Sequence, residues 1–288
     1  MAIHSMTAFA RESCSEPCSL VVELRSVNQR YLDLHFKLPD SLRALEPRLR
    51  EALAARLRRG KIDCQLRLGG DGDSAVAPRL HRERLASVGA LLAEVGAAVP
   101  GLAAPDALAL LQYPGVCDLP QVDATALQGA ATACFEGALD ALCASRAREG
   151  ERLEGFLRQR LDALAAVATA VRAELPQLRR RQEERLRNRL AELNVDIDGG
   201  RLEQELVYLL QKSDVDEELD RLDAHLAESR RVLDAGGPCG RRLDFLLQEF
   251  NREANTLSSK STAGSTTQHA VEMKVLIEQM REQVQNIE

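Results

Sequence analysis

Two acidic residues near the C-terminus have a spacing that suits metal-ion chemistry. Glu249 and Glu253 are four residues apart in a segment, residues 240–257, that is predicted to be helical. Residues four apart lie one above the other on a helix, so both carboxylates can bind one divalent cation. Such a cation can activate water against a phosphodiester bond. We therefore predict that Glu249 and Glu253 are metal ligands and catalytic residues.

A second polar stripe precedes this pair. Four residues recur at steps of four, three and four along a predicted helix over residues 201–233: Asp214, Glu218, Arg221 and His225. This spacing places them on one helix face, and a Gly-Gly-Pro turn allows the two helices to face each other. We predict Asp214 and Glu218 as further metal ligands, and His225 as a ligand or a proton-transfer catalyst. The alternative is that both stripes form surface salt bridges.

The best-known catalytic motifs are absent from the sequence. It contains no Gly-x-x-x-x-Gly-Lys phosphate loop, no Gly-x-Ser-x-Gly elbow and no His-Glu-x-x-His zinc helix. The seven cysteines form no Cys-x-x-Cys pair, so they are predicted to be small core residues in a reducing environment. There is neither a signal-peptide pattern at residues 1–9 nor an apolar run of about 18 residues, so we expect a cytoplasmic protein without a membrane span.

The predicted strands lie at the N-terminus. Residues 31–38 alternate apolar and polar side chains, which is typical of a half-buried strand. Similar patterns predict strands over 3–12, 19–28 and 61–68, and leucines at helical spacing predict a helix over residues 41–59. The fold class expected from this order is α+β, with a small antiparallel sheet and a helix at the N-terminus.

The remainder is predicted to be mainly helical. A helix is expected over residues 79–98, a Pro- and Gly-interrupted junction over 100–120, and almost continuous helix from residue 123. We therefore divide the chain into an N-terminal domain, 1–120, and a helical domain with long coiled-coil-like helices, 121–288.

One helical segment has a heptad-like apolar seam. Leucine, alanine and valine alternate at spacings of four and three between Leu157 and Leu178. Such a seam predicts either an interface between subunits or an antiparallel helix pair within one chain. Pro176 lies inside the seam and is expected to kink or break the helix.

Several segments together resemble the YicC/YloC family. Ser5–Arg11 is similar to its Ser-Met-Thr-Gly-Phe-Gly-Arg opening, with alanine at positions 8 and 10 in place of glycine. The other matching segments are Glu23–Asp33, Arg59–Lys61, Arg201–Glu205, Asp214–His225, Gly240–Lys260 and Arg281–Glu288. The resemblance spans essentially the whole chain, although residues 70–195 carry little of it.

The resemblance implies an RNA endonuclease linked to stress responses and small-RNA turnover. It also implies a homo-oligomer, a hexamer, and a requirement for a divalent metal ion, Mg²⁺ or Mn²⁺. Other RNA-decay enzymes are further potential partners. The side chains that we predict to bind RNA phosphates are Arg241, Arg242, Arg252, Lys260, Arg25, Arg30 and Lys61.

Charge and composition bear on how RNA is held. The net charge is −6, but residues 1–68 and 146–193 each carry 12 basic and 8 acidic side chains. Aromatic residues make up only 3% of the chain, which favours contacts to phosphates over stacking on bases. The alternatives to a nuclease are a non-catalytic RNA-binding adaptor that delivers RNA to another ribonuclease, and a structural coiled-coil assembly.

Overall fold

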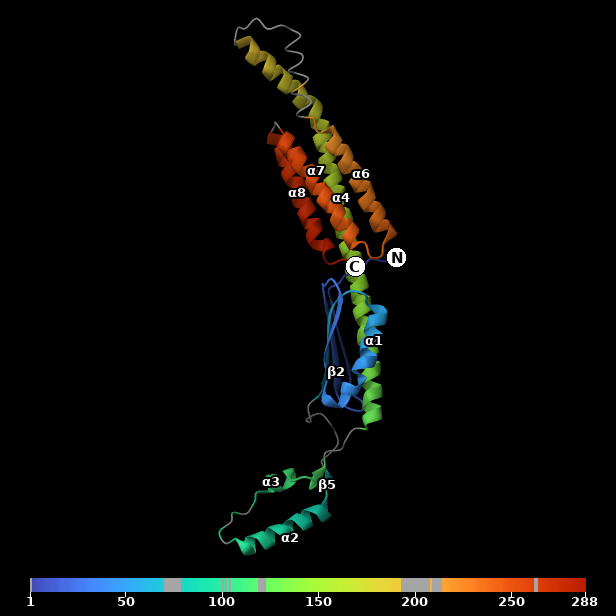
Figure 1. Cartoon of the computed structure of the whole chain (residues 1–288), viewed down its shortest axis with the longest axis vertical. Helices are drawn as coiled ribbons and strands as arrows, with labels where there is room; N and C mark the ends of the chain where they lie inside the picture. The colour runs from blue at the N-terminus through green and yellow to red at the C-terminus, as the bar shows by residue number, and fades with distance from the viewer. Residues whose placement is uncertain are drawn as a thin grey trace.

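The protein is an elongated molecule in which a bundle of helices, a β-sheet and a smaller helical unit follow one another along the longest axis (Figure 1). The computed structural model describes residues 2–69, 79–99, 101, 103, 105–118, 123–192, 208, 214–261 and 264–288. No helix within these ranges is both long enough and apolar enough to cross a membrane.

The N-terminal sheet has four strands in the order β1-β2-β4-β3. The strands are β1 (Ala8–Cys14), β2 (Leu20–Val27), β3 (Leu32–Lys37) and β4 (Gly60–Leu68). β1 and β4 pair antiparallel with β2, as expected, but β3 runs parallel to β4, so the sheet is mixed. The reason is the crossover between β3 and β4 through η1 (Asp40–Leu45) and α1 (Glu46–Arg56), since a crossover of this kind returns the chain in the same direction.

One helix, α4 (Ala124–Glu192), runs from the sheet to the helical bundle over 69 residues. Its first part, from Leu127 to Leu142, belongs to the hydrophobic core of the sheet. Its second part, from Leu153 to Leu175, belongs to the core of the bundle. Pro176 lies inside α4, so of the two predicted outcomes, a kink or a break, the break was wrong.

The bundle is completed by three C-terminal helices. These are α6 (Asp216–Ala235), α7 (Gly240–Lys260) and α8 (Gly264–Val284). The heptad-like seam of α4 is buried against leucines of α6, including Leu219 and Leu222, which confirms the packing within one chain. The predicted helix over 201–233 is confirmed from residue 216; most of its earlier part lies outside the described residues.

The sheet and the bundle are joined where the N-terminal segment crosses α4. Ser5 donates its backbone N–H to the carbonyl oxygen of Arg146, and it forms an isolated β-bridge with Ile287. A side chain at Gly150 would have its Cβ 1.9 Å from the carbonyl oxygen of Ile3, so only glycine permits this crossing. The division at residue 120 stays a prediction, because α4 contributes to both cores.

The smaller unit, here called the α2–α3 unit, consists of β5 (Arg79–Leu80), α2 (Arg82–Ala98), α3 (Ala107–Gln112) and β6 (Cys117–Asp118). β5 pairs antiparallel with β6. Figure 1 shows this unit projecting beyond the sheet, at the opposite end from the helical bundle.

Candidate metal and RNA site

α6 and α7 are adjacent antiparallel helices, and their sequence explains why. Two glycines with positive φ, Gly236 at 63° and Gly237 at 73°, reverse the chain between them. α7 has a strongly apolar face, with Leu243, Leu246 and Phe250 buried in the bundle core. The polar stripes of both helices lie beside this core and face each other.

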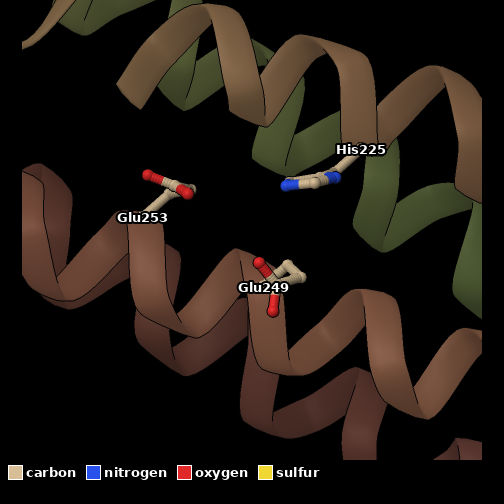
Figure 2. Close-up of side chains that lie close together, drawn as sticks. All are labelled: His225, Glu249 and Glu253. Atoms are coloured by element: carbon tan, nitrogen blue, oxygen red, sulfur yellow. The ribbon is translucent and has the colours of Figure 1, made fainter. Parts of the chain in front are cut away.

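Three side chains of these stripes converge: His225 of α6, and Glu249 and Glu253 of α7. One ligand atom from each residue lies within 4.8 Å of the other two. Figure 2 shows the imidazole and both carboxylates directed into one space between the helices. Among the residues that the structure describes, this is the only group of three histidine, cysteine or acidic side chains that meets this criterion.

The electrostatics of the cluster favour a bound cation. Glu253 is only 2% exposed, yet its one ion pair with a described residue is a long contact of 3.7 Å between its Oε1 and a guanidinium nitrogen of Arg221. Glu249 is half-buried, and its contact with Arg252 is 3.9 Å long. Burying a carboxylate is costly unless a positive charge and hydrogen bonds compensate it. A divalent cation between these side chains would supply the missing charge.

Packing fixes the position of the histidine ring. His225 meets the ring of Phe250 edge to face, with centroids 5.9 Å apart and an interplanar angle of 84°. Phe250 is fully buried and adjacent to Glu249 in sequence. The core of the bundle therefore holds the imidazole in place beside the carboxylates.

Asp214 and Glu218, the other two predicted ligands, have different partners. Asp214 pairs with Arg179 of α4 at 2.9 Å. Glu218 Oε1 accepts a hydrogen bond of 2.9 Å from Lys260 Nζ. The antiparallel register explains this separation. Glu218 lies seven residues before His225 on α6, and Lys260 lies seven residues after Glu253 on α7. Each step is about 10 Å along the helix, so Glu218 meets Lys260.

Glu218 is nevertheless an unusual carboxylate. It is 4% exposed, and its Oε2 is buried without a hydrogen-bond partner in the described part of the chain. Lys260 supplies the nearest positive charge, and it also donates to the backbone carbonyl of Asp214. The structure thus uses Lys260 to neutralise a buried carboxylate, whereas the sequence suggested a phosphate-binding role.

The predicted RNA-binding arginines of α7 differ in their contacts. Arg242 forms an ion pair with Glu228 of α6, and hydrogen bonds from Arg231, followed by the charges of Arg231 and Arg242, hold the pKa of the Glu228 carboxyl below its usual value. Arg241 is exposed and makes no ion pair with any described residue. Arg252 is exposed beside the cluster.

The three predicted residues of the sheet lie near the junction with the bundle. Arg25 and Lys61 are on neighbouring strands, β2 and β4, and Arg30 stacks over the ring of Tyr31 at 5.2 Å. Asn28, two residues before Arg30, donates a hydrogen bond to the carbonyl of Gln285. The same end of the bundle holds the N-terminus of α7, because Gly240 abuts the carbonyl of Ile287. Arg30 and Arg241 therefore both lie near the end of the bundle that adjoins the sheet.

Sequence reasoning left Arg221 without a functional role. Its charge lies beside Glu217 and Glu253, and these two carboxylates are the largest causes of the raised pKa of its guanidinium. The position four residues before His225 already indicated that Arg221 shares the face of the cluster. A cation so close to the carboxylates of the cluster is well placed to contact a phosphate oxygen.

Comparisons with known proteins cover both halves of the chain. The N-terminal region of the YicC-like endoribonuclease family matches residues 3–155, and the C-terminal region of that family matches residues 171–288. A protein of Haemophilus influenzae named probable endoribonuclease YicC is 44% identical over 287 residues, which cover 99% of this chain and 100% of that protein. A protein of the same name from Clostridioides difficile is 29% identical over 290 residues, 99% of each chain. The chain therefore belongs to the YicC-like endoribonuclease family.

Proposed function

We propose that this protein is a metal-dependent endoribonuclease and that His225, Glu249 and Glu253 hold the metal ion. The observation that carries the proposal is the convergence of their ligand atoms within 4.8 Å around a buried, poorly compensated carboxylate. The names of the two relatives, both probable endoribonucleases, support the choice of RNA as substrate.

The donor set fits a divalent cation. Carboxylate oxygens are the ligands that Mg²⁺ and Mn²⁺ prefer, and an imidazole nitrogen favours a transition metal. Between the two expected ions, the presence of His225 therefore favours Mn²⁺. When bound, such an ion supplies an activated water and charge stabilisation for phosphodiester hydrolysis.

The protein side chains have separate roles in this proposal. Glu249 and Glu253 provide the negative charge that retains the cation, and His225 completes the site as a ligand held by Phe250. Arg221 and Arg252 flank the cluster and contact the oxygens of the RNA phosphates near the cleaved bond. Arg241 and the basic residues Arg25, Arg30 and Lys61 of the sheet hold phosphates farther along the strand.

The decisive experiment combines metal binding with cleavage. Binding of Mn²⁺ to the metal-free protein is measured by the loss of the paramagnetic resonance signal of free Mn²⁺, and cleavage of labelled RNA is measured with and without a chelator. We expect both to be lost together in Glu253→Gln. Glu217→Gln is the matched control, because Glu217 also pairs with Arg221 but is exposed at the helix surface.

Two outcomes would contradict the proposal. Cleavage that persists in the chelator would exclude a metal-dependent mechanism. RNA binding without any cleavage, with Mn²⁺ present, would favour the non-catalytic adaptor. The hexamer, the role in stress and small-RNA turnover, the contact with other RNA-decay enzymes and the cytoplasmic location stay predictions.

A further inference from the structure

α7 exposes one large aromatic ring to solvent. Phe245 is 60% exposed, whereas its apolar neighbours in the helix, Leu243, Leu246 and Leu247, are at most 5% exposed. No aromatic or cation–π contact with a described residue involves the ring of Phe245. Single exposed apolar side chains are common on protein surfaces, so the exposure alone has no functional meaning. The side chains around the ring give it significance.

Phe245 lies on the helix face that leads to the candidate metal site. Glu249 follows it by four residues, and Arg241 precedes it by four. Residues at this spacing lie one above the other, about 6 Å apart along the helix axis. Arg252, seven residues after Phe245, returns to the same face two turns farther on. The exposed ring therefore lies between two arginines and one helical turn from a carboxylate of the candidate metal site.

Both arginines are accessible to a ligand. Arg241 is exposed and makes no ion pair with a described residue. The side chain of Arg252 is 72% exposed, and its one ion pair with a described residue, Glu249, is a long contact of 3.9 Å. An exposed guanidinium without a close acidic partner is suited to binding phosphate oxygens. A nucleic-acid strand held by both arginines passes over the ring of Phe245.

We propose that Phe245 stacks on an unpaired base of the RNA strand, beside the phosphate that the metal ion would hold. The inference rests on the proposed function, because it takes RNA as the ligand of this helix face. Every nucleobase has a flat face that can stack on an aromatic ring, whereas the bases of a duplex are already stacked on one another. Phe245 therefore selects single-stranded RNA at the cleavage site without reading its sequence.

The polar surroundings of the ring favour a nucleic acid over a protein partner. The exposed residues next to Phe245 on this face are Arg241, Gln248 and Arg252, and no other large apolar side chain of α7 is exposed. The core of a protein–protein interface gathers several buried apolar side chains. A lone ring between polar residues does not provide such a core, but it matches the combination of stacking and phosphate contacts that holds a single strand.

The low aromatic content of the chain is compatible with this role. Aromatic residues make up 3% of the sequence, too few to stack on each base along a bound strand. Phosphate contacts therefore hold most of the strand. Phe245 adds one stacking position at the place where the strand must be positioned accurately for cleavage.

Tryptophan fluorescence can report the stacking directly. The chain has no tryptophan, so Phe245→Trp introduces a single indole fluorophore. We expect its emission to be quenched when a single-stranded RNA oligonucleotide is added in the presence of a chelator, which prevents metal-dependent cleavage. The matched duplex, and an abasic strand of equal length, should bind through their phosphates but leave the emission almost unchanged. All measurements use the full-length protein.

Affinity measurements separate stacking from simple apolar contact. Phe245→Leu keeps an apolar side chain but removes the flat ring, so binding of the single strand should weaken about tenfold, with little change for the duplex. Phe245→Tyr should behave as the wild type. Tyr113→Leu is the matched control, since it removes an exposed ring of the α2–α3 unit, at the opposite end of the molecule from the bundle (Figure 1). Thermal melting should show intact folding, because Phe245 is outside the bundle core.

Three results would overturn the inference. The first is an indole in the Phe245→Trp protein that emits as a buried ring and does not respond to RNA, since the ring would then pack against protein. The second is an exposed indole that bound single-stranded RNA leaves unquenched. The third is an equal loss of affinity for the single strand and the duplex in Phe245→Leu.

These results are independent of the nuclease activity, which is measured separately with Mn²⁺. Quenching without any cleavage would retain the stacking role of Phe245 and contradict the proposed function. Cleavage without quenching would retain the proposed function and contradict the stacking role.

Discussion

The α6–α7 pair and the α2–α3 unit depart from ordinary protein structure in opposite directions. The first buries acidic side chains, Glu218 and Glu253, beside a hydrophobic core, and the second exposes leucine and valine to solvent. Each arrangement is unfavourable for the isolated chain. Each unfavourable arrangement indicates what would compensate it. A buried negative charge is compensated by a cation, and an exposed apolar surface is compensated by contact with another apolar surface.

The largest effect should come from Glu253→Gln. Loss of a metal-activated water costs several kcal/mol of transition-state stabilisation, so cleavage should fall about a hundredfold or more. Without metal, the variant should melt no lower than the wild type, because glutamine removes a buried charge. With excess Mn²⁺ only the wild type should gain stability, by about 2.7 kcal/mol at a hundred times Kd. A well-folded variant that cuts RNA at the wild-type rate would place the active site elsewhere.

Lys260→Ala should have the next largest effect, and on stability. The variant leaves the Glu218 carboxylate buried without its cation. Removing one partner of a buried ion pair costs about 3–5 kcal/mol, and Lys260 is 30% exposed, so we expect about 2–3 kcal/mol by denaturant unfolding. Adding Glu218→Gln should recover most of this loss. Weaker RNA binding at unchanged stability would instead support the phosphate-binding role first predicted for Lys260.

Glu228→Gln should change RNA binding only modestly. The ion pair with Glu228 holds Arg242 back from phosphates. Releasing Arg242 should raise the affinity for single-stranded RNA a fewfold and steepen the salt dependence by about 0.7 log units per log of salt. Because the pKa of Glu228 is lowered in the folded protein, its ion pairs persist above the usual pKa of a glutamate and are lost as the pH falls through the folded value. Acidification should therefore have the same effect on Arg242 as the substitution.

The smallest effect should be that of Leu91→Ala on folding stability. This side chain is 58% exposed and belongs to neither core, so the free energy of unfolding should change by less than about 0.5 kcal/mol. Leu222→Ala, at a position with 0% exposure, should cost about 2–5 kcal/mol. Both losses are measured by denaturant unfolding. Equal losses would show that Leu91 is packed in a core of its own.

Local patterns predicted most of the fold. The alternation in residues 31–38 and the leucine spacing after residue 41 correspond to β3 and to η1 with α1. The direction of β3 relative to β4 was not predictable from alternation, because parallel and antiparallel strands share the same period. A break at Pro176 does not occur, because tertiary packing on both sides, at Leu175 and Leu178, stabilises the helix beyond the local cost of proline.

Only part of the candidate site was predictable from the sequence. Spacing along one helix brought Glu249 and Glu253 together, since that relation is fixed by the helix itself. The contact with His225 depends on the register between two helices, and so does the exclusion of Glu218. Glu218 lies two helical turns before His225 on α6, and at that position it pairs with Lys260 and not with the cluster. Single-helix periodicity contains no information on that register.

The continuity of α4 has a consequence for cooperativity. The core of the sheet and the core of the bundle each require one part of the same helix. The turns between them are also held, because Arg146 is 3% exposed and donates to the carbonyl of Ser5 at 2.6 Å. Melting either core would strip one part of α4 of its packing and release this central arginine. We therefore expect that heat unfolds the two halves matched by the family in a single transition.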